Sequence, residues 1–176
     1  ASIRRAIAAG DVYQVCLTLR ARLGPAKGSA LFARLCRRGL PRFAAWVRLP
    51  GGRELVSASP ELFLACDGRR ALTQPMKGTA PAGRGRALRL SAKDAAELAM
   101  ITDLLRNDLT PVCRPGSVRV RAARRFIRLP YAVQAVSEVE GSLLPGLGPL
   151  DALKALHPGG SVTGAPKRAA LGFIRR

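Results

Sequence analysis

The chain has 176 residues, of which 48% are hydrophobic and 5% aromatic. This is the length of a single domain with a sizeable core, and so high an apolar fraction excludes a disordered chain. Thirty basic and eleven acidic residues give a formal net charge of +19. That charge suits an anionic ligand, but no basic block or nucleic-acid motif accompanies it. We therefore expect a positive field that attracts a small dicarboxylate, and no main role in nucleic-acid binding.

The cysteine pattern argues against a zinc site. Four cysteines are spread singly, none forms a C-x-x-C pair, and the one histidine, His157, lies far from all of them in the sequence. Zinc ligands normally occur in close pairs, so we expect reduced cysteines in a cytoplasmic protein. Neither a signal-peptide pattern nor a long apolar run is present, so we expect neither secretion nor membrane insertion.

Helices and strands are predicted to alternate in the first third of the chain. A helix is expected over residues 2–9, followed by an alternating strand over 11–19. A second helix is expected over 29–38, and strands follow at 43–49 and 54–57. A meander of strands with helices interposed favours an α+β fold over a doubly wound parallel sheet.

A tight hairpin is predicted next. Residues 62–64 are apolar and indicate a buried strand, and the Asp-Gly pair at 67–68 is a strong turn signal. Residues 71–73 begin the returning strand, which Pro75 ends.

The returning strand carries Lys77 back towards Glu61. An ammonium group is costly in an otherwise apolar approach, and burial lowers the pKa of a lysine and makes it a usable nucleophile or base. A surface lysine in a loop after Pro75 is the more common outcome for such a residue, and both interpretations stay open on the residues alone.

The longest helix is predicted in the second half of the chain. Residues 80–89 are rich in proline, glycine and arginine and are expected to form a mobile loop. Ser91 then opens the helix, with Asp94 three residues on as a capping box. The buried stripe of this helix is expected to be Leu98, Ile101, Leu104 and Leu105.

A glycine-rich loop is expected near the end of the chain. It follows a turn into a strand at 113–120, a segment at 131–137 and a short helix at 151–156. The loop itself spans 157–167 and enters a helix whose first residue is expected to be Pro166. Free backbone N–H groups and a hydroxyl there suit a carboxylate. The G-K-[ST] order of a phosphate-binding P-loop is missing.

Several of these segments resemble the motifs of the chorismate-utilising enzymes, the family that includes anthranilate synthase and aminodeoxychorismate synthase component I. They are S-P-E-L-F at 59–63, P-M-K-G-T at 75–79, K-D-A-A-E-L-A-M-I-T-D-L at 93–104, R-N-D-L at 106–109 and H-P-G-G-S-V-T-G-A-P-K at 157–167.

The resemblance implies a partial two-layer sandwich of antiparallel β-sheet and α-helices, of the anthranilate synthase component I type. It spans 1–176 as one chorismate-binding domain that is expected to be truncated at both ends. The C-terminal part is expected to be absent because the family's R-G-x-Y-x-G segment, its G-A-G loop and its late E-x-x-E are not found in the sequence.

The resemblance also implies roles for two residues of the hairpin. Lys77 matches a lysine proposed to attack the chorismate ring, and Glu61 matches the proposed acid/base. Anthranilate synthases usually carry alanine where this chain has Lys77, so the aminodeoxychorismate branch is implied. Gln14 stands where water-using relatives carry a lysine, which implies an ammonia-using enzyme.

The metal and substrate contacts are implied in the same way. Glu97 is assigned to Mg²⁺, a cation that prefers oxygen ligands. The residues implied for substrate binding are Gly160, Ser161, Thr163, Gly164, Thr79 and Gln134. The last of these is a departure from the family, because a histidine usually stands at that position and glutamine cannot deliver a proton as imidazolium does.

The function expected from the resemblance is the Mg²⁺-dependent amination of chorismate to 4-amino-4-deoxychorismate, on the route to p-aminobenzoate and folate, by an enzyme of transaminase or lyase type. No Cys-His-Glu arrangement of a glutaminase is readable, so a separate glutamine amidotransferase is expected to supply ammonia. The alternatives are anthranilate synthase component I and an inactive chorismate-binding remnant.

Overall fold

The computed structural model describes residues 2–22, 24–37, 39–129 and 131–175. The first half of the chain forms α1 (Ser2–Ala8), β1 (Gln14–Val15), α2 (Gly28–Cys36), β2 (Phe43–Arg48), β3 (Glu54–Ser59), β4 (Leu62–Cys66), β5 (Arg70–Gln74) and β6 (Met76–Pro81). The second half forms α3 (Gly85–Leu90), α4 (Ala92–Leu109), β7 (Arg119–Arg128), β8 (Ala132–Ser142), α5 (Pro149–Leu156), α6 (Gly160–Thr163), β9 (Gly164–Ala165) and α7 (Lys167–Ile174). Short 3₁₀ turns lie at Pro50–Gly52 and Thr110–Val112.

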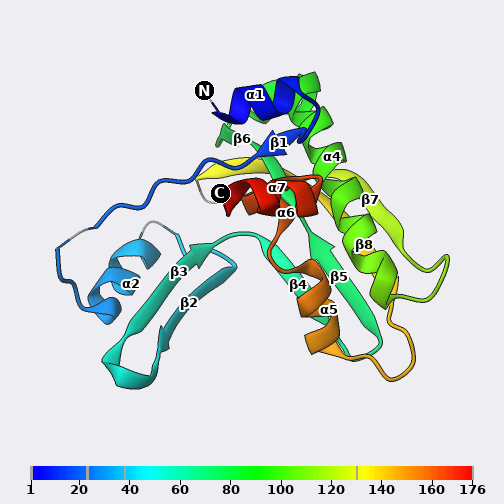
Figure 1. Ribbon diagram of the computed structural model, residues 1–176. Helices are drawn as coiled ribbons and strands as arrows, with labels where there is room; N and C mark the ends of the chain where they lie inside the picture. Colours follow the sequence, from blue (N-terminus) through cyan, green and yellow to red (C-terminus); the bar gives the residue numbers. More distant parts are fainter. Residues whose placement is uncertain (1, 23, 38, 130, 176) are drawn as a thin grey trace.

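A five-stranded antiparallel sheet is the main scaffold (Figure 1). Its central strand is β8, which pairs with β7 along one side. On the other side β6 pairs with the first half of β8, where Lys77 lies opposite Ala135, and β5 pairs with the second half, where Thr73 lies opposite Val139. The strand β4 extends the sheet beyond β5. The predicted α+β class with antiparallel pairing is therefore confirmed.

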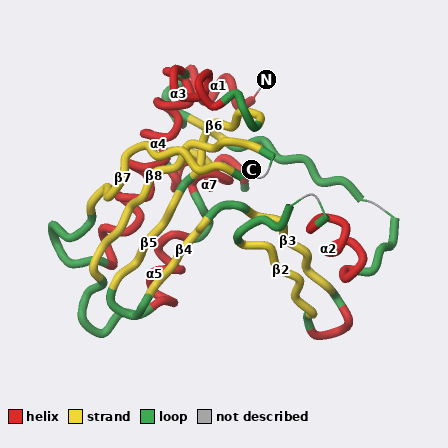
Figure 2. The backbone as a smooth tube through the Cα atoms, turned by 180° about the vertical axis from the view of Figure 1, so that it is seen from behind, coloured by secondary structure: helices red, strands yellow, loops and turns green. Residues whose placement is uncertain are grey.

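The helices α4 and α5 cover one face of this sheet, whereas the opposite face carries no helix of the described chain (Figures 1 and 2). Ile101, Leu105 and Leu109 of α4 share a buried cluster with Val139 of β8. The predicted stripe is confirmed at Leu98, Ile101 and Leu105, which are buried. Apolar burial against β8 thus holds α4 in place, at roughly 2 kcal/mol for each fully buried leucine or isoleucine.

One polar contact crosses this apolar layer. The hydroxyl groups of Thr102 on α4 and Ser137 on β8 lie 2.6 Å apart, and Thr102 also donates to the carbonyl of Leu98 at 2.6 Å. Because the hydroxyl of Ser137 is buried, it would lose this partner if the helix slipped along the sheet, whereas Thr102 would keep its bond to Leu98. The contact therefore fixes the register of α4 on β8.

A smaller unit of β2, β3 and α2 stands apart from the main sheet (Figure 1). The hairpin pairs Trp46 with Val56. The carboxylate of Glu54 accepts the backbone N–H of Gly28 at 2.7 Å and the indole N–H of Trp46 at 2.8 Å. The bond from Gly28, followed by that from Trp46, lowers the pKa of Glu54. These bonds attach α2 to the hairpin.

Three predicted elements differ from the structure. The segment 80–89 is not a loop, because β6 continues to Pro81 and α3 covers Gly85–Leu90, with Leu88 buried beside Gly78. The predicted strand over 11–19 is reduced to Gln14–Val15, because only these residues pair with β9. Pro166 is the cap before α7 and not its first residue. The last residue of the predicted helix over 29–38 lies outside the described residues.

None of the helices within the described ranges is both long enough and apolar enough to cross a membrane.

The core of α4 gives a direct test of this packing. Leu98 is 1% exposed, whereas Leu90 at the end of α3 is 75% exposed. Leu98→Ala is expected to lower the free energy of unfolding by about 2–5 kcal/mol, because it leaves a cavity against β8. Leu90→Ala is the matched control and should change it by no more than about 0.5 kcal/mol. Urea unfolding followed by circular dichroism measures both, and equal effects would contradict the packing described.

Candidate functional site

The junction between β3 and β4 positions the carboxyl group of Glu61. The backbone N–H of Glu61 donates to the hydroxyl of Ser59 at 3.2 Å, and that hydroxyl lies 3.4 Å from the carbonyl of Glu61. Because Pro60 between them has a fixed φ, the local chain has little freedom. Glu61 is consequently held half-buried at the start of β4.

Lys77 on β6 lies close enough to Glu61 for its charge to act on the carboxyl group. Burial raises the pKa of Glu61 above its ordinary value of 4.5, and the backbone N–H of Met76 and the positive charge of Lys77 act in the opposite direction. Lys77 is itself half-buried. Within the described residues the two side chains form no salt bridge, so only the electrostatic influence of Lys77 on Glu61 is shown, and their chemical roles stay predictions.

A bulge in β6 sets the positions of the neighbouring residues. The pairing with β8 shifts between Lys77, opposite Ala135, and Thr79, opposite Gln134. Gly78 lies at the shift with a φ of +80°, and a Cβ there would come within 2.9 Å of Asp94 on α4. Only glycine fits both the backbone conformation and the close approach.

Thr79 and Gln134 form a polar pair next to this bulge. The amide of Gln134 donates to the hydroxyl of Thr79 at 3.3 Å. The Oε1 atom of Gln134 is buried and has no hydrogen-bond partner within the described part of the chain. A buried acceptor without a partner costs about 1–3 kcal/mol, so this amide oxygen is the unsatisfied polar atom of the pair.

The glycine-rich loop is held against α4 and β1. A Cβ on Gly160 would lie 2.0 Å from Leu104 of α4, and one on Gly164 would lie 2.1 Å from the carbonyl oxygen of Gln14. The hydroxyl of Thr163 donates to the carbonyl of Gly159 at 2.9 Å and is buried. Ser161 is half-buried on α6. These close approaches require glycine and fix the path of the loop.

A buried ion pair anchors the end of the same loop. The ammonium of Lys167 lies 2.5 Å from the carboxylate of Asp108 and donates to the carbonyl of Leu156 at 2.9 Å. Both charged side chains are almost buried, at 13% and 12% exposed. Burial raises the pKa of Asp108, and Lys167 opposes this shift. The contact ties the loop between α5 and α7 to the last turn of α4.

Glu97 lies on the face of α4 that carries these contacts. Asp94, which lies beside Gly78, is three residues before Glu97. Leu104, which lies beside Gly160, is seven residues after it. These spacings place the three helix residues on one side of α4. Glu97 is half-buried, and its only ion pair among the described residues is a 3.8 Å contact with Lys93.

The described residues contain no group of three or more histidine, cysteine or carboxylate side chains that could hold a metal. Glu97 nevertheless offers the oxygen donor that Mg²⁺ prefers, and this ion keeps several waters when one or two carboxylates bind it. Glu97 is thus one candidate oxygen donor for such an ion, and a magnesium site at this position stays a prediction.

A hollow of about 520 Å³ opens beside Glu61. Phe43, Phe63 and Leu150 line it, and Lys77 is not part of its lining. Among the described residues, Glu61 is therefore the one carboxyl group that faces this largely apolar hollow.

Comparison with known proteins decides the family. The model of the chorismate binding enzyme family matches residues 1–176. Anthranilate synthase component 1 of Streptomyces coelicolor is 37% identical over 99% of this chain and 36% of its own length. The chain belongs to the chorismate-binding enzyme family. Aminodeoxychorismate synthase of Streptomyces pristinaespiralis is 41% identical over 98% of this chain and 25% of its own length.

A solved structure agrees with this assignment. Anthranilate synthase component I of Streptococcus pneumoniae superposes with a TM-score of 0.79 and 27% identity, over 97% of this chain and 39% of that one. The resemblance and the sandwich of the anthranilate synthase component I type are thereby confirmed. The chain spans well under half the length of the chorismate-binding relatives it matches.

Sequence reasoning missed two residues near this site. Asp94 had been assigned only to the helix start, where its N–H does donate to Ser91 at 3.2 Å, but its side chain also packs against Gly78. Lys167 lay within a matched motif without an assigned role. The three-residue spacing between Asp94 and Glu97 indicates that both lie on one face of the helix. No pattern in the sequence indicates the pairing of Lys167 with Asp108.

The buried ion pair allows a prediction for stability. Lys167→Met leaves the carboxyl group of Asp108 without a cation and is expected to lower the free energy of unfolding by roughly 3 kcal/mol. Lys154→Met on α5 is the control, since Lys154 is exposed, and its effect should stay below about 0.5 kcal/mol. Chemical unfolding at pH 7 measures both, and a Lys167 variant as stable as the control would show that the pair contributes nothing.

The raised pKa of Glu61 predicts a dependence of stability on pH. The folded chain binds the proton of Glu61 more tightly than the unfolded chain, so stability falls as pH rises above the ordinary value of 4.5. Glu61→Gln removes this titration and should flatten the fall just above that pH. Urea unfolding at closely spaced pH values tests this, and parallel curves for the two proteins would refute it.

Proposed function

We propose that this chain carries the catalytic amine and carboxyl group of an aminodeoxychorismate synthase component I. The reaction replaces the C4 hydroxyl of chorismate by ammonia, so that 4-amino-4-deoxychorismate and water are formed. The observation that supports this most is that the positive charge of the half-buried Lys77 acts on the half-buried carboxyl group of Glu61. Such a pair can supply a nucleophile and an acid/base.

The proposed chemistry gives each group of the pair a separate task. The amine of Lys77 attacks the ring as the C4 hydroxyl departs, and ammonia then displaces the lysine. Glu61 donates the proton that the departing hydroxyl needs. Burial raises the pKa of Glu61, which keeps a larger protonated fraction near neutral pH than an exposed glutamate would have.

The substrate is proposed to sit between the bulge of β6 and the glycine-rich loop. Backbone groups of Gly160 and Gly164, with the hydroxyls of Ser161 and Thr163, would hold a carboxylate. On the other side Thr79 and the free Oε1 of Gln134 would contact the ring hydroxyl or its neighbours. Gln134 can orient a substrate but cannot protonate it. This leaves the acid role to Glu61.

The proposed cofactor is Mg²⁺. Its charge would neutralise a carboxylate of the substrate, with Glu97 and Asp94 as the side chains of this chain that face it.

The proposed partner is a glutamine amidotransferase that supplies ammonia, and the proposed setting is the cytoplasmic pathway to p-aminobenzoate and folate. The comparisons give no support to a transaminase or lyase designation.

The main alternative is an anthranilate synthase component I, because relatives of both kinds match at similar identity. Lys77 favours the aminodeoxychorismate branch, since an alanine is expected at its position in the other. An inactive chorismate-binding remnant is the second alternative, and the glutamine at position 134 is the observation that favours it.

The test is the identity of the product. The intact protein, given chorismate, Mg²⁺ and ammonium, is expected to form 4-amino-4-deoxychorismate, measured by liquid chromatography and mass spectrometry. Lys77→Ala should lower the rate by roughly 100-fold or more, because it removes the nucleophile. Lys154→Ala, a change at an exposed lysine, should leave the rate within about twofold. Anthranilate as the product would overturn the branch, and no turnover of the wild type would favour the remnant.

A further inference from the structure

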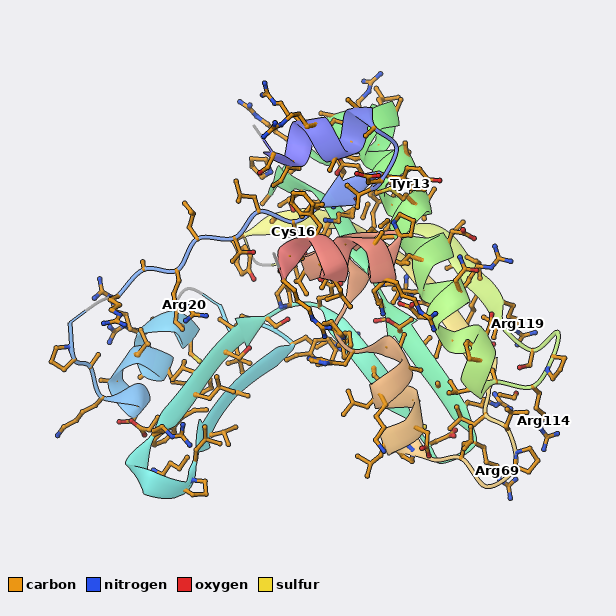
Figure 3. The ribbon with its side chains drawn as sticks, in the orientation of Figure 1. Tyr13, Cys16, Arg20, Arg69, Arg114 and Arg119 are labelled. Carbon is orange, nitrogen blue, oxygen red and sulfur yellow. The ribbon has the colours of Figure 1, made fainter. Side chains whose placement is uncertain are left out.

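Three arginines gather at the end of the main sheet that lies away from Lys77. Arg69 and Arg70 lie at the turn between β4 and β5, and Arg114 lies before β7. Figure 3 shows Arg69 and Arg114 at the same end of the molecule, with Arg20 on the opposite side. Ser142 beside them is seven residues along β8 from Ala135, the partner of Lys77, which corresponds to roughly 20 Å.

These arginines line one hollow of about 500 Å³, which we call the arginine hollow. Its wall also includes Ser142 and the turn at residues 143–147. Two backbone bonds hold its three segments together. The N–H of Arg114 donates to the carbonyl of Ser142 at 2.8 Å, and the N–H of Leu143 donates to that of Arg69 at 2.8 Å. The three guanidinium groups therefore project from backbone that is fixed in relative position.

The arginine hollow carries positive charge that the described chain does not neutralise. None of its three arginines forms a salt bridge with a described carboxylate. The nearest acidic residue, Asp67, accepts the backbone N–H groups of Arg69 and Arg70 at 2.9 and 2.7 Å. By contrast, Arg119 on the adjoining strand is paired with Glu140 at 2.6 Å.

We propose that the arginine hollow binds a compact anion that carries two or more phosphate groups. Guanidinium groups bind phosphate through paired N–H donors, and three of them match a multivalent anion better than a single monovalent charge. A hollow of about 500 Å³ has the size of a small-molecule site. An acidic polypeptide would need a longer surface, so the limited size of the hollow favours the small anion.

Calorimetric titration of the purified protein with inorganic tripolyphosphate, at constant ionic strength, tests this proposal. Arg69→Ala with Arg114→Ala should weaken binding at least tenfold. Arg20→Ala with Arg22→Ala removes the same charge from exposed positions elsewhere and should change binding less than twofold. Lys77→Ala should also leave it unchanged, because the proposed chorismate site is separate. Circular dichroism confirms that each variant is folded.

Four results would overturn the proposal. The proposal is wrong if the wild-type protein does not bind tripolyphosphate. It is also wrong if the two double variants weaken tripolyphosphate binding equally, because that indicates general charge attraction. Loss of binding in Lys77→Ala would place the anion in the proposed chorismate site. Orthophosphate or hexaglutamate that binds as tightly as tripolyphosphate would show a non-selective or a peptide-binding surface.

Discussion

The packing of α4 on the centre of the main sheet is the constraint on which the candidate site depends. Burial of its apolar stripe against β8 supplies the free energy, and the hydroxyl contact to Ser137 fixes the position along the strand. The same helix then meets the bulge of β6, the glycine-rich loop and the start of α7. Its contacts, in order along the helix, are Asp94 with Gly78, Leu104 with Gly160, and Asp108 with Lys167. A single helix thereby sets the separation between segments that are about eighty residues apart in sequence.

The carboxyl groups of Glu61 and Asp108 both have a raised pKa, but their surroundings differ. Burial raises the pKa of both Glu61 and Asp108, and a lysine opposes the shift in each case. The cation beside Asp108 also donates to a backbone carbonyl, so it is committed to holding the loop. The described chain shows no such additional bond for Lys77. Lys167 with Asp108 therefore has a structural role, whereas no described hydrogen bond or salt bridge engages the amine of Lys77.

Short sequence patterns correctly predicted the turns and helix starts that depend only on neighbouring residues. The Asp-Gly turn predicted the hairpin of β4 and β5, and Ser91 predicted the start of α4, where its side chain caps the helix as expected. The nearness of Lys77 to Glu61 followed from this hairpin and the family motifs. The helix α3 was missed because Gly83 and Gly85 suggested a loop, whereas the burial of Leu88 against Gly78 stabilises a helical turn.

Long-range pairing could not be predicted in the same way. The strand at 11–19 has the alternation of a strand, but its length is set by its partner β9, which offers two residues. The free Oε1 of Gln134 and the packing of Asp94 depend on the bulge at Gly78, which shifts the register of β6 by one residue. No periodicity in the sequence reports such a shift.

The position of Glu61 has a mechanical consequence. The unit of α2, β2 and β3 is joined to the rest of the chain only through the segment 16–27 and through Ser59, Pro60 and Glu61. Because Pro60 makes the second connection stiff, any tilt of that unit relative to the main sheet is transmitted to the next residue along the chain. A change in the tilt of the outlying unit is therefore expected to displace the backbone that carries the carboxyl group of Glu61.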